Sequence, residues 1–529
     1  MIKEADLLKM SIILCFTVFI FFFSAGVKAD FVMTNELELI NNSVSGPGSN
    51  NSILSEGFSF KGDFNFTKRQ ELNNYDFLLN MGLNTRGDVQ SNQQEFNLSR
   101  FKARFKNQEN DSIFNVGDTF EFFDQYVLNS SLKGISYKQN ITTRDSFTFV
   151  YGYDYPGWDD IFSDECQAIT RRSLGINYKN NRGNKINWGI SLLNTDDIEA
   201  VDADDILYNN NIYGLSWEYL PIAGLTVRGS SAYGSTEESD GNNYSGTAHK
   251  VKIFSSAKEG RASIDYERVE PEFKTLLGSA TNDVEKYRFS LLYRYSRKIN
   301  YNFDYTYYHD NINKQKEDTT YYCKPSAGVS IKHLFDRRYA STSLKYNYNK
   351  KETTTKKIED NIFSINYRDR FKLLDVNMNV NYAQEEEKVD SDINKENEIT
   401  YNLSLSTRKR MEKYILRPVL RFGYFKNDDE EEDNSNSNFE KSLELGFDIP
   451  AKKISSSLKL GEREALSDSS EDNSKLFANL SIYYRPQFLD KYNRGRVYLK
   501  LKYNDVNYSE NVDENFSENT VTTGINFGF

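Results

Sequence analysis

The sequence predicts an all-β fold: a transmembrane barrel of antiparallel strands that follow one another up and down around the ring. Three observations predict it. Apolar and polar residues alternate with a period of two in segments of about ten to fourteen residues, which recur from Phe31 onward. The chain has 36 Tyr and 37 Phe, although its mean hydropathy is only −0.69. Short and long connections alternate between the segments. A barrel with a polar lumen needs only every second strand residue to be apolar, so it accounts for all three observations.

Residues 1–29 are predicted to be a secretory signal peptide. Two lysines precede an apolar run from Met10 to Val27, and Val27–Ala29 is a small-x-small cleavage site. An uncleaved membrane anchor is the alternative, but the run is somewhat short for a spanning helix of about 20 residues. We therefore expect residues 30–529 to form a single barrel domain.

The strand pattern is clearest in the second half of the chain. An apolar row from Tyr287 to Tyr295 and another from Tyr301 to Tyr307 flank a turn at Ser296–Lys298. Strands of this length fit a tilted crossing of a bilayer, and tyrosines near strand ends suit its interfaces. Further rows are Leu344, Tyr346 and Tyr348; Leu374, Val376, Met378, Val380 and Tyr382; Leu416, Leu420, Phe422 and Tyr424; and Val497, Leu499, Leu501 and Tyr503.

The last residues of the sequence, from Asn519 to Phe529, carry one more alternating strand, with Ile525, Phe527 and Phe529 on its apolar face. This segment resembles the C-terminal signature of bacterial outer-membrane β-barrel proteins, which end in alternating aromatic residues and a final Phe. The resemblance implies a location in the outer membrane, in contact with lipid and lipopolysaccharide. It also implies that the barrel-assembly machinery recognises this strand.

The connections predict the number of strands and their direction. In outer-membrane barrels short turns face the periplasm and long loops face outward. The alternation gives about 26 strands, within a range of roughly 22 to 28, with both ends of the barrel on the periplasmic side. A phase shift between Leu98 and Phe101 predicts a bulge. Short turns include Asn180–Gly183, Pro221–Gly224, Lys258–Arg261, Ser296–Lys298, Arg408–Glu412 and Pro450–Lys453; long loops include Asp154–Ala168, Thr195–Leu207, Gly234–Gly246, Glu270–Val284, Gln384–Asn397, Lys426–Asn438 and Leu466–Asn473.

A soluble β-propeller or β-helix is the main alternative fold. A propeller should repeat every 40 or so residues with glycine or tryptophan signatures, and no such repeat occurs. The net charge of −11 gives no indication of a nucleic-acid partner.

The residues that alternate with the apolar rows are predicted to face the lumen. They are polar and of mixed charge, which is typical of a water-filled channel. Ion selectivity stays open, because acidic residues share the inner face. The basic candidates for pore-lining residues are Arg288, Arg294, Lys345, Arg368, Arg417, Arg421, Lys500 and Lys502.

Two functions are compatible with such a barrel. The first is a porin-like channel for passive passage of small hydrophilic solutes or ions. The second is a structural sheath that holds a periplasmic or lumenal partner protein across the outer membrane, since about 26 strands enclose a wider bore than a porin of 16–18 strands. The architecture of the second is similar to the barrel component of porin–cytochrome electron conduits, whose partner is a multihaem cytochrome. No sequence motif here carries that family.

Catalysis is not indicated by the sequence. Of the three histidines, only His309 lies beside an acid, Asp310, and no nucleophile pattern accompanies it. No metal or cofactor motif is present; Cys-x-x-Cys-His, the site of covalent haem attachment, does not occur. Whether Cys166 and Cys323 form a disulfide stays open.

Two kinds of segment allow alternative interpretations. The long loops carry acidic residues, such as Asp428–Asp433 and Glu385–Glu387. One interpretation is that they are solvated loop residues. The other is that they bind divalent cations that bridge lipopolysaccharide phosphates, or that they dock a cationic partner. The stretch Gly117–Gly134 is too apolar for an ordinary exposed loop. It is an inward-folded constriction or a partner surface, or it forms two poorly alternating strands.

Overall fold

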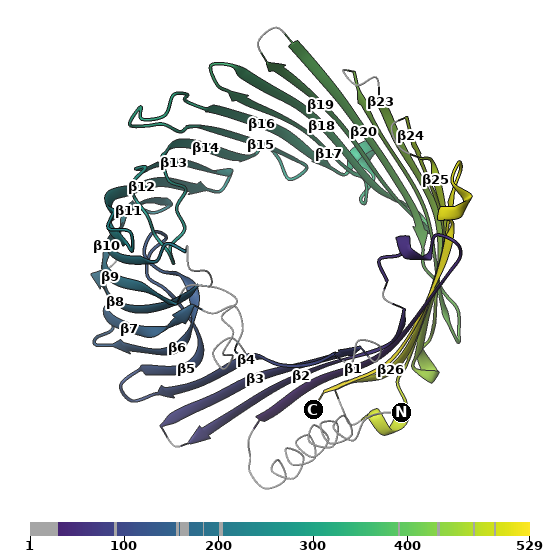
Figure 1. Ribbon diagram of the computed structural model, residues 1–529, viewed down its shortest axis with the longest axis horizontal. Helices are drawn as coiled ribbons and strands as arrows, with labels where there is room; N and C mark the ends of the chain where they lie inside the picture. Colours follow the sequence, from purple (N-terminus) through teal and green to yellow (C-terminus); the bar gives the residue numbers. More distant parts are fainter. Residues whose placement is uncertain are drawn as a thin grey trace.

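The computed structural model describes residues 30–528 except 55, 73, 89–92, 155–157, 159–168, 183–184, 200–204, 390–391, 431–433, 469–470 and 491–492. The chain forms one closed antiparallel barrel of 26 strands, as the sequence predicts (Figure 1). The predicted signal peptide, Cys166 and Phe529 lie outside the described residues. None of the described helices is long and apolar enough to cross a membrane.

The strands follow one another around the ring in chain order. They are β1 Asp30–Ser45, β2 Gly57–Leu72, β3 Tyr75–Asp88, β4 Gln93–Asn107, β5 Ser112–Phe122, β6 Asn129–Asn140, β7 Asp145–Asp154, β8 Thr170–Arg182, β9 Ile186–Glu199, β10 Tyr208–Ile222, β11 Leu225–Glu238, β12 Asn243–Ala257, β13 Gly260–Val269, β14 Val284–Arg294, β15 Ile299–His309, β16 Tyr321–Lys332, β17 Ser341–Glu352, β18 Lys356–Phe371, β19 Leu374–Val389, β20 Asp392–Thr407, β22 Ile415–Asp429, β23 Asn434–Ile449, β24 Ile454–Ser467, β25 Asn473–Tyr484, β26 Asn493–Tyr508 and β27 Phe516–Gly528. The short strand β21, Lys409–Arg410, pairs with the start of β22 within the connection from β20. Short 3₁₀ helices are η1 Ser49–Asn51, η3 Leu334–Asp336, η4 Pro450–Lys452, η5 Gln487–Leu489 and η6 Val512–Glu514.

The ring closes where β1 pairs with β27, from Thr34 opposite Gly528 to Ser45 opposite Ser517. Closure leaves no strand edge unpaired, which a chain that spans a bilayer requires because lipid offers no hydrogen bonds. The end of the barrel where β1 begins and β27 ends is called here the terminal rim, and the other end the opposite rim.

The two faces of the wall differ in chemistry. Residues directly opposite one another in an antiparallel pair point to the same face, so the register fixes one set of side chains around the ring. One face carries large apolar side chains that remain exposed, among them Leu192, Leu215, Leu291, Phe363 and Leu460. A continuous apolar band of this kind suits the hydrocarbon of a bilayer.

The sequence places the bulge of β4 correctly. Leu83 of β3 lies opposite Leu98, whereas its neighbour Gly82 lies opposite Arg100, so Ser99 is the extra residue. The bulge returns Phe101 to the apolar face.

The boundaries of several connections differ from the prediction. Glu385–Glu387 belong to β19, and Asp428 belongs to β22, so these acidic residues are in strands and not in long loops. There, ion pairs such as Lys356–Glu387 (2.5 Å) join polar side chains of neighbouring strands. Conversely, two connections at the terminal rim are longer than short turns: residues 333–340, which include η3, and the connection from β25 to β26, which includes η5. The ends of β19 and β22 are as polar as a solvated loop, so composition alone does not distinguish strand from loop there.

Candidate functional site

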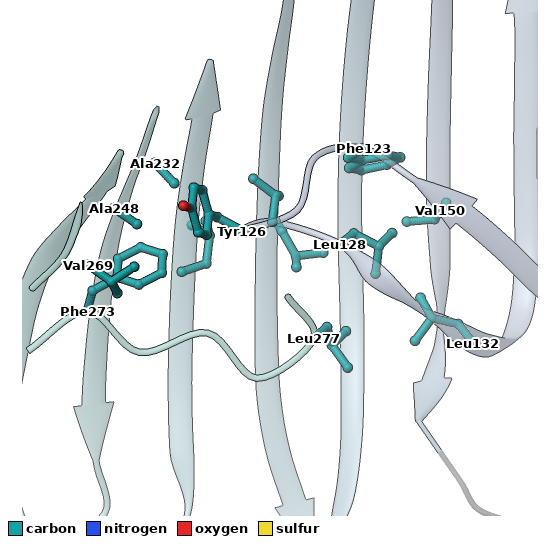
Figure 2. Close-up of a cluster of buried hydrophobic side chains, with 13 residues drawn as sticks. Phe123, Tyr126, Leu128, Leu132, Val150, Ala232, Ala248, Val269, Phe273 and Leu277 are labelled. Atoms are coloured by element: carbon teal, nitrogen blue, oxygen red, sulfur yellow. The ribbon is translucent and has the colours of Figure 1, made fainter. Parts of the chain in front are cut away.

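Two connections of the opposite rim fold into the ring and lie against its inner wall (Figures 1 and 2). One joins β5 to β6 and runs from Phe123 to Leu128; the other, residues 270–283, joins β13 to β14. We call these two segments the partition. Backbone hydrogen bonds join the two segments. The backbone amide of Asn129, which directly follows the first segment, donates to the backbone carbonyl of Leu277 (2.9 Å), and the backbone amide of Ser279 donates to the backbone carbonyl of Gln125 (2.7 Å).

The partition is held to the wall by an apolar cluster (Figure 2). Tyr126, Val127, Leu128 and Phe273 are completely buried, and the rings of Tyr126 and Phe273 meet edge to face with centroids 6.0 Å apart. Burial of aromatic and aliphatic side chains is worth roughly 1.5–3 kcal/mol each, so the cluster fixes the partition firmly. The wall contributes Leu132, Val150, Leu193, Ile212, Ala232, Ala248 and Val269 to this cluster.

Small wall residues make room for the partition. A Cβ atom on Gly214 of β10 would lie 2.4 Å from the side chain of Val127, and one on Gly246 of β12 would lie 2.5 Å from the backbone nitrogen of Phe273. Gly175 of β8 makes room for Phe123 in the same way, because a Cβ atom there would lie 2.8 Å from the Phe123 ring. The sequence of the inner wall is therefore shaped to the connection that covers it.

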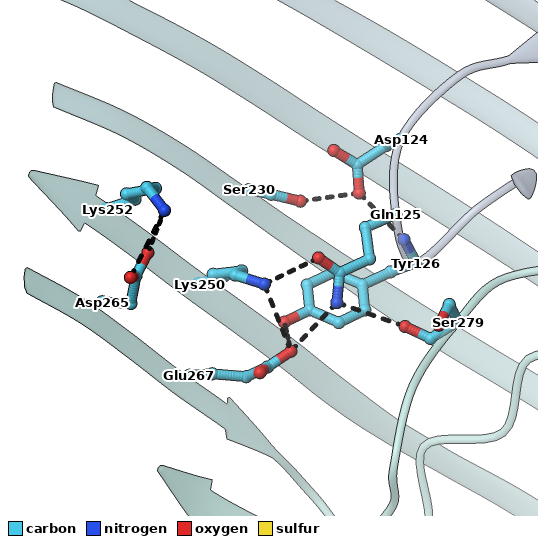
Figure 3. A network of polar contacts seen from close by, with 9 residues as sticks. All are labelled: Asp124, Gln125, Tyr126, Ser230, Lys250, Lys252, Asp265, Glu267 and Ser279. Atoms are coloured by element: carbon cyan, nitrogen blue, oxygen red, sulfur yellow. Dashed lines mark hydrogen bonds and ion pairs between the residues drawn. The ribbon is translucent and has the colours of Figure 1, made fainter. Parts of the chain in front are cut away.

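A polar network fixes the turn of the partition (Figure 3). The hydroxyl of Tyr126 donates to Oε1 of Glu267 (2.8 Å), and the side-chain amide Nε2 of Gln125 donates to the same oxygen (3.0 Å). Lys250 donates to the side-chain oxygen Oε1 of Gln125 (2.8 Å), and Ser230 donates to Asp124 (2.6 Å). Burial, with the nearby carboxylate of Glu267, raises the pKa of Tyr126 far above its usual value, so the hydroxyl remains a donor.

The second connection of the partition is also clamped at the rim. Lys274 forms an ion pair with Glu238 of β11 (2.6 Å), and its carbonyl accepts a hydrogen bond from Asn210 (3.0 Å). Asp283 pairs with Lys316 of the connection 310–320 (2.5 Å). Hydrogen bonds from Lys316 and from backbone amides outweigh the desolvation of Asp283 and lower the pKa of its carboxyl.

The partition also identifies the inner face of the wall. Its contacts with Ser230, Lys250 and Glu267 show that these side chains point inward, and Val251 and Ile253, on the other face of β12, are exposed. Lys250 lies opposite Glu267, which lies opposite Lys286, and the register extends this assignment from strand to strand. By this criterion every basic residue proposed from the sequence lies on the inner face: Arg288, Arg294, Lys345, Arg368, Arg417, Arg421, Lys500 and Lys502.

These eight side chains differ in their partners. Arg417 binds Asp448 through two nitrogens, each 2.7 Å from a carboxylate oxygen. Arg421 pairs with Glu444 (2.7 Å). Lys500 of β26 pairs with Glu38 of β1 (3.1 Å) across the junction of β1 and β27, which we call the seam. Arg368 donates to the side chain of Asn377 (2.7 Å). Within the described part of the chain no acidic side chain lies within 4 Å of Arg288, Arg294, Lys345 or Lys502.

The seam carries a contact that the sequence did not reveal. The hydroxyl of Tyr498, a residue that is 5% exposed, lies 2.9 Å from Glu36 and 2.6 Å from Glu38 of β1, and the two carboxylates share its single proton. The Tyr498 ring lies over Gly524, where a Cβ atom would be 2.4 Å away. Tyr498 is 460 or more positions from Glu36 and Glu38, so no local sequence pattern could pair them. Of the proposed assembly residues, Ile525 and Phe527 lie on the outer face of β27.

The residues considered for catalysis lie away from the lumen. His309 is on the outer face, where its Nε2 is 3.3 Å from Glu285, and its Nδ1 lies 3.0 Å from the Asp310 carbonyl oxygen. Cys323 also lies on the outer face and is a free thiol. No cluster of metal-binding side chains is found among the described residues.

No family model and no curated protein matches this chain. Solved structures with similar barrels include a chain of the E. coli P pilus tip assembly intermediate PapC–PapD–PapK–PapG, at 10% identity and a TM-score of 0.48. This chain is aligned over 94% of its own length but spans only 60% of the pilus chain. The E. coli outer membrane transporter YddB is similar at 10% identity, with 94% and 81% of the two chains covered and a TM-score of 0.46. Pseudomonas aeruginosa OccK2, solved with glucuronate, is similar at 9% identity, with 95% and 98% covered and a TM-score of 0.31. At these identities and scores the likeness is one of barrel architecture and assigns no function.

Proposed function

We propose that this chain is an outer-membrane channel through which small hydrophilic solutes or ions pass passively. The observation that carries the proposal is the contrast between the two faces of a closed ring. The outer face exposes a band of large apolar side chains, whereas the inner face presents Arg, Lys, Asn, Ser and acidic residues. A barrel with these two faces is suited to lipid outside and water inside.

The partition sets the shape of the proposed pore. With strands about 4.8 Å apart and tilted by about 40°, 26 strands enclose a backbone diameter of roughly 50 Å. The apolar cluster fixes the partition to the inner wall from β6 to β13, and the remaining strands carry none of that cluster's described residues. We propose that solutes pass beside the partition, along the wall that carries Lys345, Arg368 and Arg421. The terminal rim would then face the periplasm, with Ile525, Phe527 and Phe529 presented to the assembly machinery.

Liposome swelling tests this function. The refolded chain is inserted into liposomes, and the rate of swelling is measured in neutral sugars of increasing size. The proposal predicts uptake of mono- and disaccharides. The largest sugar admitted should be larger in a variant such as Phe273→Ala, which weakens the docking of the partition. A correctly folded barrel that admits none of these sugars would refute passive diffusion of small solutes.

A second candidate function is a sheath for a partner protein. The width estimated above favours it, because a lumen of this size exceeds what a small solute needs. Cross-linking in the native host followed by purification of the barrel separates the two functions. A stoichiometric partner cross-linked to inner-face positions would favour the sheath, such as one around a multihaem cytochrome. Absence of any cross-link from the same positions, with sugar uptake, would favour the channel.

A further inference from the structure

A cavity of about 500 Å³ lies between the partition and the inner wall. Gln125 and Ser279 of the partition form one side of it. The wall forms the other side with inward side chains of β12 to β15, including Lys250, Lys286 and Arg288. Its volume lies within the range of roughly 300–1,000 Å³ that is usual for small-ligand sites.

The charges that line the cavity do not balance. Lys252 forms an ion pair with Asp265 (3.1 Å), and Lys250 lies 3.9 Å from Glu267. Both carboxylates are therefore engaged, and Glu267 in addition accepts hydrogen bonds from the partition. Two further cations, Lys286 and Arg288, also line the cavity.

Lys286 and Arg288 have no acidic partner within 4 Å among the described residues. They lie two positions apart on the same face of β14, so their backbones are only about 7 Å apart. Their like charges line the same cavity and repel one another, and a bound anion would relieve the repulsion. An arginine fork also suits a carboxylate or a phosphate, which it binds through two parallel hydrogen bonds.

The cationic surface continues beside the cavity. Tyr308, which lines the cavity, stacks on Tyr322 with centroids 4.2 Å apart and planes at 10°. Lys286 lies 5.6 Å from the centre of the Tyr308 ring, and Lys324 lies 5.7 Å from both rings. The aromatic pair holds these ammonium groups in place by cation–π contact and supplies no negative charge that would neutralise them.

We propose that this cavity binds a small organic or inorganic dianion, whose two negative charges meet Lys286 and Arg288. The shared chemistry is that of a dicarboxylate or a phosphate. Ser279 and Thr281 offer hydroxyl groups at the partition side. As the solute class of a channel the inference rests on the proposed function, but binding itself can be measured without transport.

Isothermal titration of the refolded full-length barrel in detergent tests the site at low salt and pH 7.5. The probes are succinate and inorganic phosphate, each titrated separately, with succinamide as the uncharged counterpart of succinate. We expect saturable binding of at least one dianion and none of succinamide. Binding of one probe only identifies the dianion class, and a barrel with native mobility and strand content that binds neither overturns the proposal.

Two variants inside the cavity and a matched control outside it test the location. Lys286→Gln and Arg288→Gln should each weaken dianion binding at least tenfold. Arg294→Gln removes the same charge from the same face of the same strand, but outside the cavity, and should change the affinity less than twofold. Equal losses in all three variants would show general attraction to a positive lumen and overturn the site. Dianion binding by a barrel that passes no solute would support the site while refuting the channel, so the two failures are distinguishable.

Discussion

The partition is predicted to be held mainly by its buried aromatic residues, and Phe273→Ala tests this. Phe273 is completely buried against Tyr126 and the wall at Gly246. Removal of a fully buried Phe side chain costs about 3–5 kcal/mol. The strands around it are joined by continuous ladders of backbone hydrogen bonds, so the loss falls on the docking of the connection 270–283 and not on the ring. The equilibrium for release of the partition should rise by roughly two to four orders of magnitude.

Native-state hydrogen exchange measures this release in the full-length barrel. The reporters are the backbone amide of Asn129, which directly follows the first segment and donates to the second, and the backbone amide of Ser279, which donates to the first. Both should exchange at least 100-fold faster in Phe273→Ala, by the same arithmetic, if release of the partition limits their exchange. Phe120→Ala is the control, because Phe120 lies on the other face of β5 and is 57% exposed. Unchanged exchange in Phe273→Ala, or an equal increase in Phe120→Ala, would refute the packing argument.

Two further substitutions test how the wall and the seam are built. Gly214→Ala places a Cβ atom 2.4 Å from the stiff side chain of Val127 and should accelerate exchange of the same reporter amides at least about fivefold, since overpacking costs about 1–3 kcal/mol. Gly423→Ala, whose nearest neighbour is an amide oxygen at 3.3 Å, is the control, and equal behaviour of the two would contradict the fit. Tyr498→Phe removes the single hydroxyl donor that Glu36 and Glu38 share and should lower the free energy of unfolding in urea by about 1.5–3 kcal/mol, since Glu38 loses a hydrogen bond of 2.6 Å. An unchanged unfolding midpoint would show that the seam does not depend on this contact.

The fold could be predicted because its determinants are local. A period of two assigns each strand and each face, and the phase shift near Leu98 locates the bulge of β4. Closure follows once all strands are counted, since an unpaired edge is not stable in lipid. Alternation likewise assigns the eight basic candidates to the face on which the register places them, while their role in lining a pore stays a prediction.

The ends of the hairpins could not be predicted from alternation. Beyond the apolar band neither face of a strand needs to be apolar, so a paired polar strand and a solvated loop have the same composition. Glu385–Glu387 illustrate this, because they pair with β18 and β20 as regular strand residues.

The partition was only partly predictable. The apolar stretch from Gly117 to Gly134 combines both alternatives: Phe120 lies on a regular strand, whereas Tyr126 folds inward. The second segment, 270–283, had the composition of an ordinary loop. One signal was present in the sequence, namely small or apolar residues such as Gly214 and Ala248 at positions that should be polar if they faced water.

Single-channel conductance of the refolded chain in a planar bilayer tests the central claim most directly. A polar lumen only partly covered by the partition predicts large, steady openings whose conductance rises in proportion to salt concentration. A folded barrel that inserts but stays electrically silent would contradict an open channel and would favour a lumen filled by a partner.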